Sequence, residues 1–326
     1  MKKVLVTGGA GYIGSHAVVE LLDSGYEVIV LDNLENGFRD SVDERAKFYL
    51  ADVRDISSFE KIFEENKIDV VMHFAGYIKV GESSILPNKY YLNNTYGVMN
   101  LIEVMNRYNV KNIIFSSTAA TYGEVKGDAL VTEEYPQNPI NPYGMSKLMA
   151  EKIIFDAAKS YGINYSIFRY FNVGGAHEKY PIGQKGEGVT ALIAILLQVA
   201  KGEREKLEVY GNDYPTKDGT GIRDYIHVVD LVRAHVLAIK ALEKNISGVY
   251  NLGNGTGFTV LEMLEDARKV TGHKIPTTFG PRRAGDPASV VASSAKAREV
   301  LGWKPEYTDV SKIISTAWNF MQSYKK

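Results

Sequence analysis

Cysteine is absent from this chain of 326 residues. Without thiols there is no disulfide, no thiolate metal site and no cysteine nucleophile, and such a composition suits a reducing cytoplasm. An excess of charge of one sign is missing too, because 38 Lys and Arg residues stand against 39 Asp and Glu residues. The net charge of −1 gives no reason to expect a nucleic-acid partner, since phosphate backbones select strongly basic surfaces.

Long apolar runs are also lacking. The cationic start at residues 1–3 resembles that of a signal peptide, but the apolar residues 4–6 lead at once into Thr7-Gly8-Gly9. No stretch reaches signal-peptide or membrane-spanning length. We therefore predict a cytoplasmic protein with no membrane partner.

Metal-ligand spacing and two common catalytic motifs are missing as well. The six histidines are scattered and lack spacing such as His-x-x-x-His, so no metal site is predicted. Neither a Gly-x-Ser-x-Gly elbow nor a Walker-type Gly-Lys-Ser occurs. We expect each histidine to be structural.

The first half of the chain alternates strand-like with helix-like segments. Apolar, β-branched runs without polar alternation suit strands that are buried on both faces of a parallel sheet. These runs lie at residues 4–6, 28–31, 70–72 and 113–115. Helical patterns of the length that a βαβ crossover needs follow at 58–66 and 91–108. The alternation predicts an α/β fold with a doubly wound (Rossmann), mostly parallel sheet.

The pattern loosens after Asn172. Residues 174–187 and 211–221 are rich in Gly, Pro and Asp, and loops of this length are usually functional or disordered. Helical patterns return at 227–242, 261–270 and 310–321, with a strand at 249–252. We predict a large unit formed by residues 1–173, to which 225–253 return, and a smaller C-terminal α/β unit formed by 174–224 and 254–326.

A glycine motif follows the first strand. Glycines at positions 8, 11 and 14 let the backbone turn tightly, approach a diphosphate and pack a helix against the strand. The helix N-terminus then directs N–H groups at the phosphates. The second strand ends in Asp32, whose carboxylate can accept both ribose hydroxyls and would repel a 2′-phosphate. Residues 33–36 supply no arginine, so we predict NAD rather than NADP. The alternative is that the glycines form an ordinary turn without a cofactor and that Asp32 is a turn residue.

Tyr143 and Lys147 form a candidate catalytic pair. They lie four residues apart at the start of a helical pattern that Asn141-Pro142 precedes and that we expect to end at Gly162. This spacing places both side chains on one helix face. A nearby ammonium lowers the pKa of a phenol, so Tyr143 can serve as a general base.

A third candidate and a decoy accompany this pair. Thr118 follows a buried strand, and its hydroxyl could bind the same substrate oxygen as Tyr143, although a strand-end threonine is more often structural. Tyr122 and Lys126 have the same spacing as the catalytic pair. Because their segment reads as a loop, nothing in the sequence fixes their geometry.

With these residues in hand, the chain resembles the UDP-sugar 4-epimerases of the extended short-chain dehydrogenase/reductase family along essentially its whole length. The matching stretches are 7–15, 32–34, 73–76, 80–83, 115–117, 143–144, 146–148, 169–172, 210–216, 218–227 and 282–283. The block from 211 to 221 is particular to these epimerases, whereas the glycine motif alone reaches only the superfamily.

The resemblance implies reversible epimerisation of a UDP-hexose at C4, which interconverts UDP-glucose and UDP-galactose with tightly bound NAD. Tyr143 would take the proton from O4 while C4 passes hydride to the nicotinamide. The 4-keto intermediate would rotate in the site and receive the hydride on its other face. Lys147 would hold the nicotinamide ribose and tune Tyr143, and Thr118 would position O4, where the family usually has serine.

The resemblance also implies the binding residues. Cofactor contacts fall on Gly8, Gly11, Tyr12, Ile13, Gly14, Asp32, Asn33, Asp52, Val53, Phe74, Ala75, Gly76, Lys79, Asn94, Ser116, Tyr143, Lys147 and Tyr170. Substrate contacts fall on Thr118, Tyr143, Asn172, Leu192, Tyr210, Arg223, Arg283, Asp286 and Val290. The larger unit would then be the NAD-binding domain and the smaller one the UDP-sugar-binding domain. The family further implies a homodimer, formed through the helices at 91–108 and 144–160.

Three positions depart from the family pattern. The family lysine after residues 73–76 falls on Ile78, so either Lys79 reaches the same cofactor group or the contact is lost. Ala191 replaces an asparagine near the sugar diphosphate. Val290 stands where strict glucose/galactose enzymes often have tyrosine, and our hypothesis is that the room it leaves admits UDP-GlcNAc and UDP-GalNAc.

Other functions stay open at this stage. A dehydratase of this family carries an Asp-Glu pair at the positions of Ala119 and Ala120. Because alanine cannot transfer a proton, these two residues disfavour elimination chemistry in this chain. A UDP-pentose or UDP-uronate 4-epimerase, a decarboxylase, a simple dehydrogenase and a non-catalytic NAD-binding protein are the remaining alternatives. Tyr210 could be a packing residue, and Arg223 could pair with Asp224 or another carboxylate.

Overall fold

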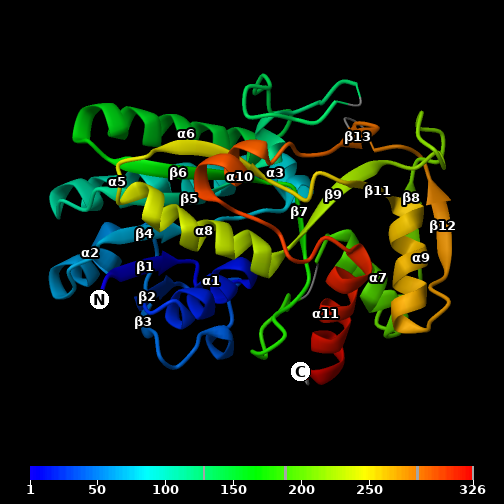
Figure 1. Cartoon of the computed structure of the whole chain (residues 1–326), viewed down its shortest axis with the longest axis horizontal. Coiled ribbons are helices and arrows are strands. Elements are labelled where there is room, and N and C mark those ends of the chain that lie inside the picture. Colours follow the sequence, from blue (N-terminus) through cyan, green and yellow to red (C-terminus); the bar gives the residue numbers. More distant parts are fainter. Residues whose placement is uncertain (128, 187–188, 284–285, 325–326) are drawn as a thin grey trace.

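The computed structural model describes residues 1–127, 129–186, 189–283 and 286–324. Its centre is a sheet of seven parallel strands in the order β10-β6-β5-β4-β1-β2-β3 (Figure 1). These strands are β1 (Lys3–Thr7), β2 (Glu27–Asp32), β3 (Lys47–Leu50), β4 (Val70–His73), β5 (Asn112–Thr118), β6 (Asn164–Tyr170) and β10 (Gly248–Leu252). The chain runs outward from β1 in both directions, so the switch point of the doubly wound sheet lies between β1 and β4.

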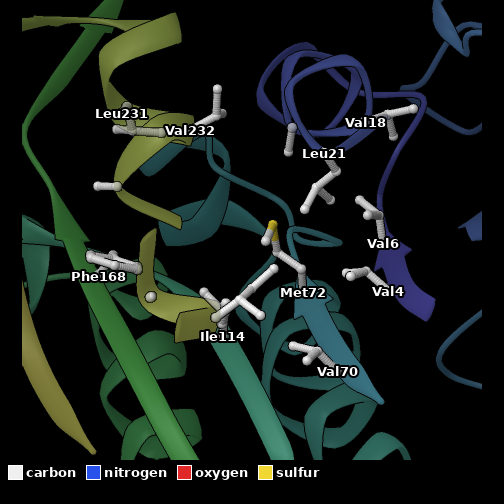
Figure 2. Packing of buried hydrophobic residues seen from close by; sticks show 14 of the residues in the cluster. Val4, Val6, Val18, Leu21, Val70, Met72, Ile114, Phe168, Leu231 and Val232 are labelled. Atoms are coloured by element: carbon white, nitrogen blue, oxygen red, sulfur yellow. The ribbon is translucent and has the colours of Figure 1, made fainter. Parts of the chain in front are cut away.

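Helices cover both faces of this sheet. One face carries α1 (Tyr12–Asp23), α8 (Val228–Leu242) and α10 (Ala295–Leu301), and the other carries α2 (Ile56–Glu65), α5 (Gly97–Arg107) and α6 (Pro142–Tyr161). Figure 2 shows Val4, Val6 and Met72 of the strands in one apolar cluster with Val18 and Leu21 of α1 and Leu231 and Val232 of α8. Leu5, between those two valines, is buried against the opposite face. Burial on both sides explains why the strand sequences show no polar alternation.

The segment before α5 differs from the predicted helix at 91–108. After α3 (Val80–Ile85) and α4 (Pro87–Tyr90), the chain makes a π-helical turn, η2 (Tyr91–Tyr96), and only then enters α5. Single π turns inside helices are rare, but those that occur often lie near functional sites. Here the turn carries the buried Asn93 and Asn94.

A second, smaller group of elements lies past the carboxyl ends of the large sheet's strands, on the right of Figure 1. A small sheet contains β9 (Ile222–His227), β7 (Asn172–Gly174), β11 (Gly257–Thr259) and β13 (Ser289–Val290), and a two-stranded sheet contains β8 (Leu207–Tyr210) and β12 (Thr277–Gly280). The helices α7 (Leu192–Ala200), α9 (Val260–Thr271) and α11 (Val310–Ser323) share a separate apolar core. Short 3-10 turns, η1 (Arg39–Ser41) and η3 (Ala119–Thr121), follow β2 and β5.

The helix and strand predictions for the second half agree with the structure to within a few residues. α8, α9 and α11 lie on the three predicted helical segments, and β10 lies on the predicted strand. α6 ends at Gly162, which adopts φ +65°, as the predicted C-terminal glycine requires. Within the described residues no helix is both long and apolar enough to cross a membrane.

Candidate active site

A cavity of about 660 Å³ opens where β1, β2, β4, β5 and β6 end, at the switch point of the large sheet. Open α/β sheets bind ligands at this edge. The predicted residues that line it are Gly8, Gly11, Tyr12, Ile13, Gly14, Asp32, Asn33, Asp52, Val53, Phe74, Ala75, Gly76, Lys79, Ser116, Thr118, Tyr143, Lys147, Tyr170, Asn172 and Leu192. The fold therefore brings most of the predicted cofactor residues and the reactive residues to one place.

The glycine turn leaves no room for side chains at two of its positions. Gly8 adopts φ +73°, and a Cβ atom there would lie 2.5 Å from the Ala75 backbone nitrogen. A Cβ atom on Gly14 would lie 2.1 Å from the Gly8 carbonyl oxygen. Gly11 is the N-cap of α1 and has no side chain to cap it. The N–H groups of the first helical turn therefore remain available to an anion in the cavity.

Asp32 is held at the end of β2. Its two carboxylate oxygens accept hydrogen bonds from the Ala10 nitrogen at 3.0 Å and the Leu34 nitrogen at 2.8 Å. Burial raises the pKa of this carboxyl, and the two backbone hydrogen bonds lower it. Each oxygen keeps a further acceptor site, which suits a ribose diol. No arginine is found among the cavity-lining residues in the described part of the chain, so a 2′-phosphate would meet Asp32 without a guanidinium partner.

Three residues that sequence reasoning missed gather at the Asp52 end of the cavity: Glu35 and Tyr77 line it, and Arg54 does not line it but pairs with Asp52. Arg54 binds Asp52 through both carboxylate oxygens, at 2.9 Å and 2.6 Å, and this pairing lowers the Asp52 pKa to about 2. Asn33 donates to the same carboxylate at 2.9 Å. The Tyr77 hydroxyl donates to Glu35 at 2.6 Å, and both residues line the cavity. Their sequence positions carry no motif, because the contact joins residues 42 apart.

The catalytic candidates on α6 are well ordered by local structure. Asn141 caps the helix by accepting a hydrogen bond from the Gly144 nitrogen at 2.8 Å. Lys147 is 2% exposed, and its Nζ donates to the Ser116 carbonyl oxygen at 2.9 Å. A Cβ atom on Gly76 would lie 3.0 Å from that Nζ, so glycine leaves the ammonium open to the cavity.

The predicted lowering of the Tyr143 pKa is wrong for the protein alone. Loss of solvent around the phenol raises the Tyr143 pKa, and only a hydrogen bond with Thr118 opposes this. Burial also lowers the Lys147 pKa to about 8, against the attraction of Glu151. Desolvation penalises both charged forms, and the ammonium is already engaged by the Ser116 carbonyl.

Tyr170, a predicted cofactor residue, and Tyr122, of the decoy pair, lie in different surroundings. Tyr170 lines the cavity, and its hydroxyl lies 2.5 Å from His235 Nε2. Tyr122 is 1% exposed, and its hydroxyl donates to Asn251 at 2.6 Å, while Lys126 is exposed. The decoy pair is therefore a core residue and a surface residue that share no site.

Six predicted binding residues do not line the cavity: Asn94, Tyr210, Arg223, Arg283, Asp286 and Val290. Asn94 lies behind the wall, where its side chain bonds the Tyr77 backbone at 2.9 and 3.0 Å. The guanidinium of Arg283 lies 3.9 Å over the Tyr210 ring. Val290 packs against the buried cluster of Tyr122, Val125 and Val131, and so does Phe171, which lines the cavity.

Of the two suggested partners for Arg223, the structure shows another carboxylate, Asp286, and not Asp224. Arg223 Nη1 donates to the carbonyl oxygens of Ile222 at 2.8 Å and Pro287 at 3.0 Å, and Nη2 lies 3.6 Å from Asp286. Asp224 is buried and accepts backbone N–H groups instead, for example that of Asn254 at 2.8 Å. Successive residues of a strand point to opposite faces, so neighbours in β9 cannot share a site easily.

The long loop predicted at 174–187 contributes to the cavity. Gly183, Gln184, Lys185 and Gly186 all line it, whereas residue 187 lies outside the described residues. Lys185 forms an ion pair at 3.0 Å with Asp40 of η1. The glycine-rich composition of this loop was the signal in the sequence, but the residues that face the cavity could not be identified from it.

Comparison with known proteins gives a consistent result. The family model described as "NAD dependent epimerase/dehydratase family" matches residues 4–253. The UDP-glucose 4-epimerase of Lacticaseibacillus casei is 53% identical over 322 residues, which cover 98% of this chain and 97% of that protein.

Two solved structures extend the comparison. The UDP-glucose 4-epimerase of Bifidobacterium longum in complex with NAD+ and UDP is 44% identical, with a TM-score of 0.93 over 98% of both chains. The UDP-Glc/GlcNAc 4-epimerase of Campylobacter jejuni is 42% identical, with a TM-score of 0.88 over 99% of this chain and 100% of that chain.

Proposed function

Because the chain belongs to the NAD-dependent epimerase/dehydratase family, we propose that it interconverts UDP-glucose and UDP-galactose by inversion at C4 with bound NAD. The observation that carries this proposal is a single cavity lined by both a dinucleotide-binding glycine turn and the reactive side chains Tyr143, Lys147 and Thr118. The relatives at about half sequence identity are UDP-glucose 4-epimerases, and their match covers nearly the whole chain.

The residues present fit NAD. The first turn of α1 would bind the diphosphate, and Asp32 would accept the adenosine ribose hydroxyls. Lys147 would donate to the other ribose from its position beside Ser116, and Tyr170 would lie beside the nicotinamide. When bound, NAD supplies a reversible acceptor for the hydride of sugar C4.

Tyr143 would move the proton. Thr118 lies next to it and can hold the sugar O4 in the geometry that proton transfer needs. Since burial raises the Tyr143 pKa, the phenolate needs positive charge in the cavity. The Lys147 ammonium and an oxidised dinucleotide together would supply it, so that proton removal from O4 is favoured only while the cofactor is ready to accept hydride.

The smaller unit would bind the nucleotide part of the substrate. Arg223 and Arg283 are suited to a diphosphate, and Tyr210 provides a ring for stacking. Asp286, which lies beside Arg223, would accept the uridine ribose. Asn172 and Leu192 line the same cavity as Tyr143. We propose on this basis that 1–173 with 225–253 bind NAD, and that 174–224 with 254–326 bind the UDP-sugar.

The proposed reaction is tested by product analysis. Purified protein is incubated separately with UDP-galactose, UDP-GalNAc and UDP-xylose without added cofactor, and the products are separated by chromatography. We expect UDP-glucose from UDP-galactose and no net accumulation of NADH. Accumulating NADH would indicate a dehydrogenase, and an inert protein would contradict the proposal.

We further propose that the enzyme accepts the N-acetyl sugars. Val290 packs on the same buried cluster as Phe171 of the cavity wall, and in this proposal its small side chain leaves room near the sugar. The Campylobacter jejuni relative, with activity on Glc and GlcNAc forms, is 42% identical.

Replacing Val290 by tyrosine should lower kcat/KM for UDP-GalNAc by about 10- to 200-fold while that for UDP-galactose changes little, because the larger ring would occupy the space for the acetamido group. Steady-state kinetics on both substrates measures this ratio, and Val290→Ala serves as the control that keeps the space open. Equal losses on the two substrates would contradict a role in specificity.

A cytoplasmic homodimer completes the proposal. Leu92, Tyr96, Met99 and Met149 are between 42% and 56% exposed and lie on η2, α5 and α6. Exposed apolar groups of this kind mark interaction surfaces. A mass measurement in solution distinguishes a dimer from the monomer that would contradict this part.

A further inference from the structure

Glu151 continues the catalytic face of α6. Tyr143, Lys147 and Glu151 follow one another at intervals of four residues, so their side chains leave the helix on the same side. The Glu151 side chain is fully buried. A carboxylate so far from solvent requires strong compensation.

Four hydrogen bonds supply that compensation. The Ser117 hydroxyl donates to Oε1 at 2.5 Å and Gln137 donates to Oε2 at 3.0 Å. Arg169 adds a bidentate pair, from Nε to Oε1 at 3.1 Å and from Nη2 to Oε2 at 2.7 Å. The Arg169 side chain is itself only 4% exposed. Each carboxylate oxygen of Glu151 therefore accepts two hydrogen bonds, one of them from the Arg169 guanidinium.

The pair connects the three elements that carry the reactive groups. Ser117 of β5 lies between Ser116, whose carbonyl holds Lys147, and Thr118, which lines the cavity. Arg169 of β6 immediately precedes Tyr170, another cavity residue. A buried ion pair is weak support for stability, because apolar residues of the same size often serve as well. Its connections to the site suggest a different purpose.

We propose that the buried Glu151–Arg169 pair is a positioning unit that fixes α6 against β5 and β6 and keeps a negative charge beside Lys147. This inference rests on the proposed epimerase function. In it, Glu151 touches neither substrate nor cofactor but acts through Ser117 on the strand that holds Thr118, and through its charge on Lys147.

The proposed effect of the Glu151 charge on Lys147 depends on the other groups around that ammonium. On α6 these are Tyr143 and Glu151, and from β4 the buried His73 faces the ammonium with its pKa lowered by burial to about 3. From β6, Tyr170 is protonated because burial raises its pKa, and Arg169 lies on the far side of Glu151. Among these described groups Glu151 alone favours the charged form of Lys147, whose pKa of about 8 would fall without it.

The test removes both charges together. Glu151→Gln/Arg169→Gln leaves no unpaired buried charge, and amide groups can still bond each other. We expect it to retain bound NAD and a KM within about twofold of wild type, with kcat about tenfold lower and the alkaline limb of the kcat–pH profile about one unit lower. Asp156→Asn, at the exposed end of α6, is the control and should change neither.

The outcomes separate the possibilities. A double variant that is less stable but keeps the wild-type kcat and alkaline limb would overturn the proposal, since the pair would then be only structural. If that variant does not fold, Ser117→Ala tests the link from Glu151 to β5. It should lower kcat severalfold without moving KM, and unchanged kcat would refute the positioning role. Absence of epimerisation by the wild-type protein would instead refute the proposed function itself.

Discussion

Replacing Tyr143 by phenylalanine is expected to lower kcat for UDP-galactose epimerisation by about 10²- to 10⁴-fold, the usual contribution of a general acid–base group. The reason is that the Tyr143 phenol shares a hydrogen bond with Thr118, and both residues line the cavity. Binding should survive, because the phenol contributes little to holding the dinucleotide or the UDP group. The measurement is kcat and KM together with the NAD content of the purified variant.

A control for this variant lies on the same helix. Tyr161 at the end of α6 is 41% exposed, and Tyr161→Phe removes a hydroxyl far from the cavity, so its kcat should equal that of wild type. If Tyr143→Phe inverted C4 at an undiminished rate, another base would have to exist. A variant that lost NAD as well would show that the hydroxyl organises the site rather than transferring the proton.

Gly14→Ala is expected to abolish cofactor retention. Its Cβ atom would lie 2.1 Å from the Gly8 carbonyl oxygen and 2.9 Å from the Gly9 Cα atom, and neither contact involves a flexible side chain. Moving the turn away from α1 should cost about 1–3 kcal/mol, as overpacking typically does. We expect the NAD bound per chain after purification to fall about tenfold or more, as measured by cofactor release on denaturation.

The matched control is Gly81→Ala in α3. A Cβ atom there meets nothing within 4 Å, so NAD content and activity should stay at the wild-type level, with helix stability equal or slightly higher. Full cofactor content in Gly14→Ala would mean that the turn does not approach the dinucleotide closely. That result would remove the main support for the cofactor site.

The core of the fold was predictable because the information is local. Strand runs such as 4–6 and 113–115 are continuously apolar, and the structure buries both of their faces. The end of α6 was predictable from Gly162, since only a residue that tolerates a left-handed backbone ends a helix in this way. The spacing of Tyr143 and Lys147 likewise follows from one helix.

Other parts of the site were not predictable because they depend on distant contacts. The π-helical turn η2 interrupts a helical pattern without any glycine or proline inside it. Tyr77 reaches Glu35, and Lys185 reaches Asp40 across 145 positions of the chain. The Tyr143 pKa was misjudged for a related reason. Helical spacing places an ammonium nearby but does not state how much solvent the phenol loses.

By itself, the sequence determined the doubly wound sheet, the glycine turn with Asp32, and the placement of Tyr143 and Lys147 on one helix. Each of these follows from residues within one or two neighbouring elements, where backbone geometry sets the distances. Only the tertiary structure decided that Glu151 and Arg169 meet beneath the site, that Arg223 turns to Asp286 rather than Asp224, and that burial outweighs charge at Tyr143. Those outcomes depend on which elements pack together and how far they exclude water.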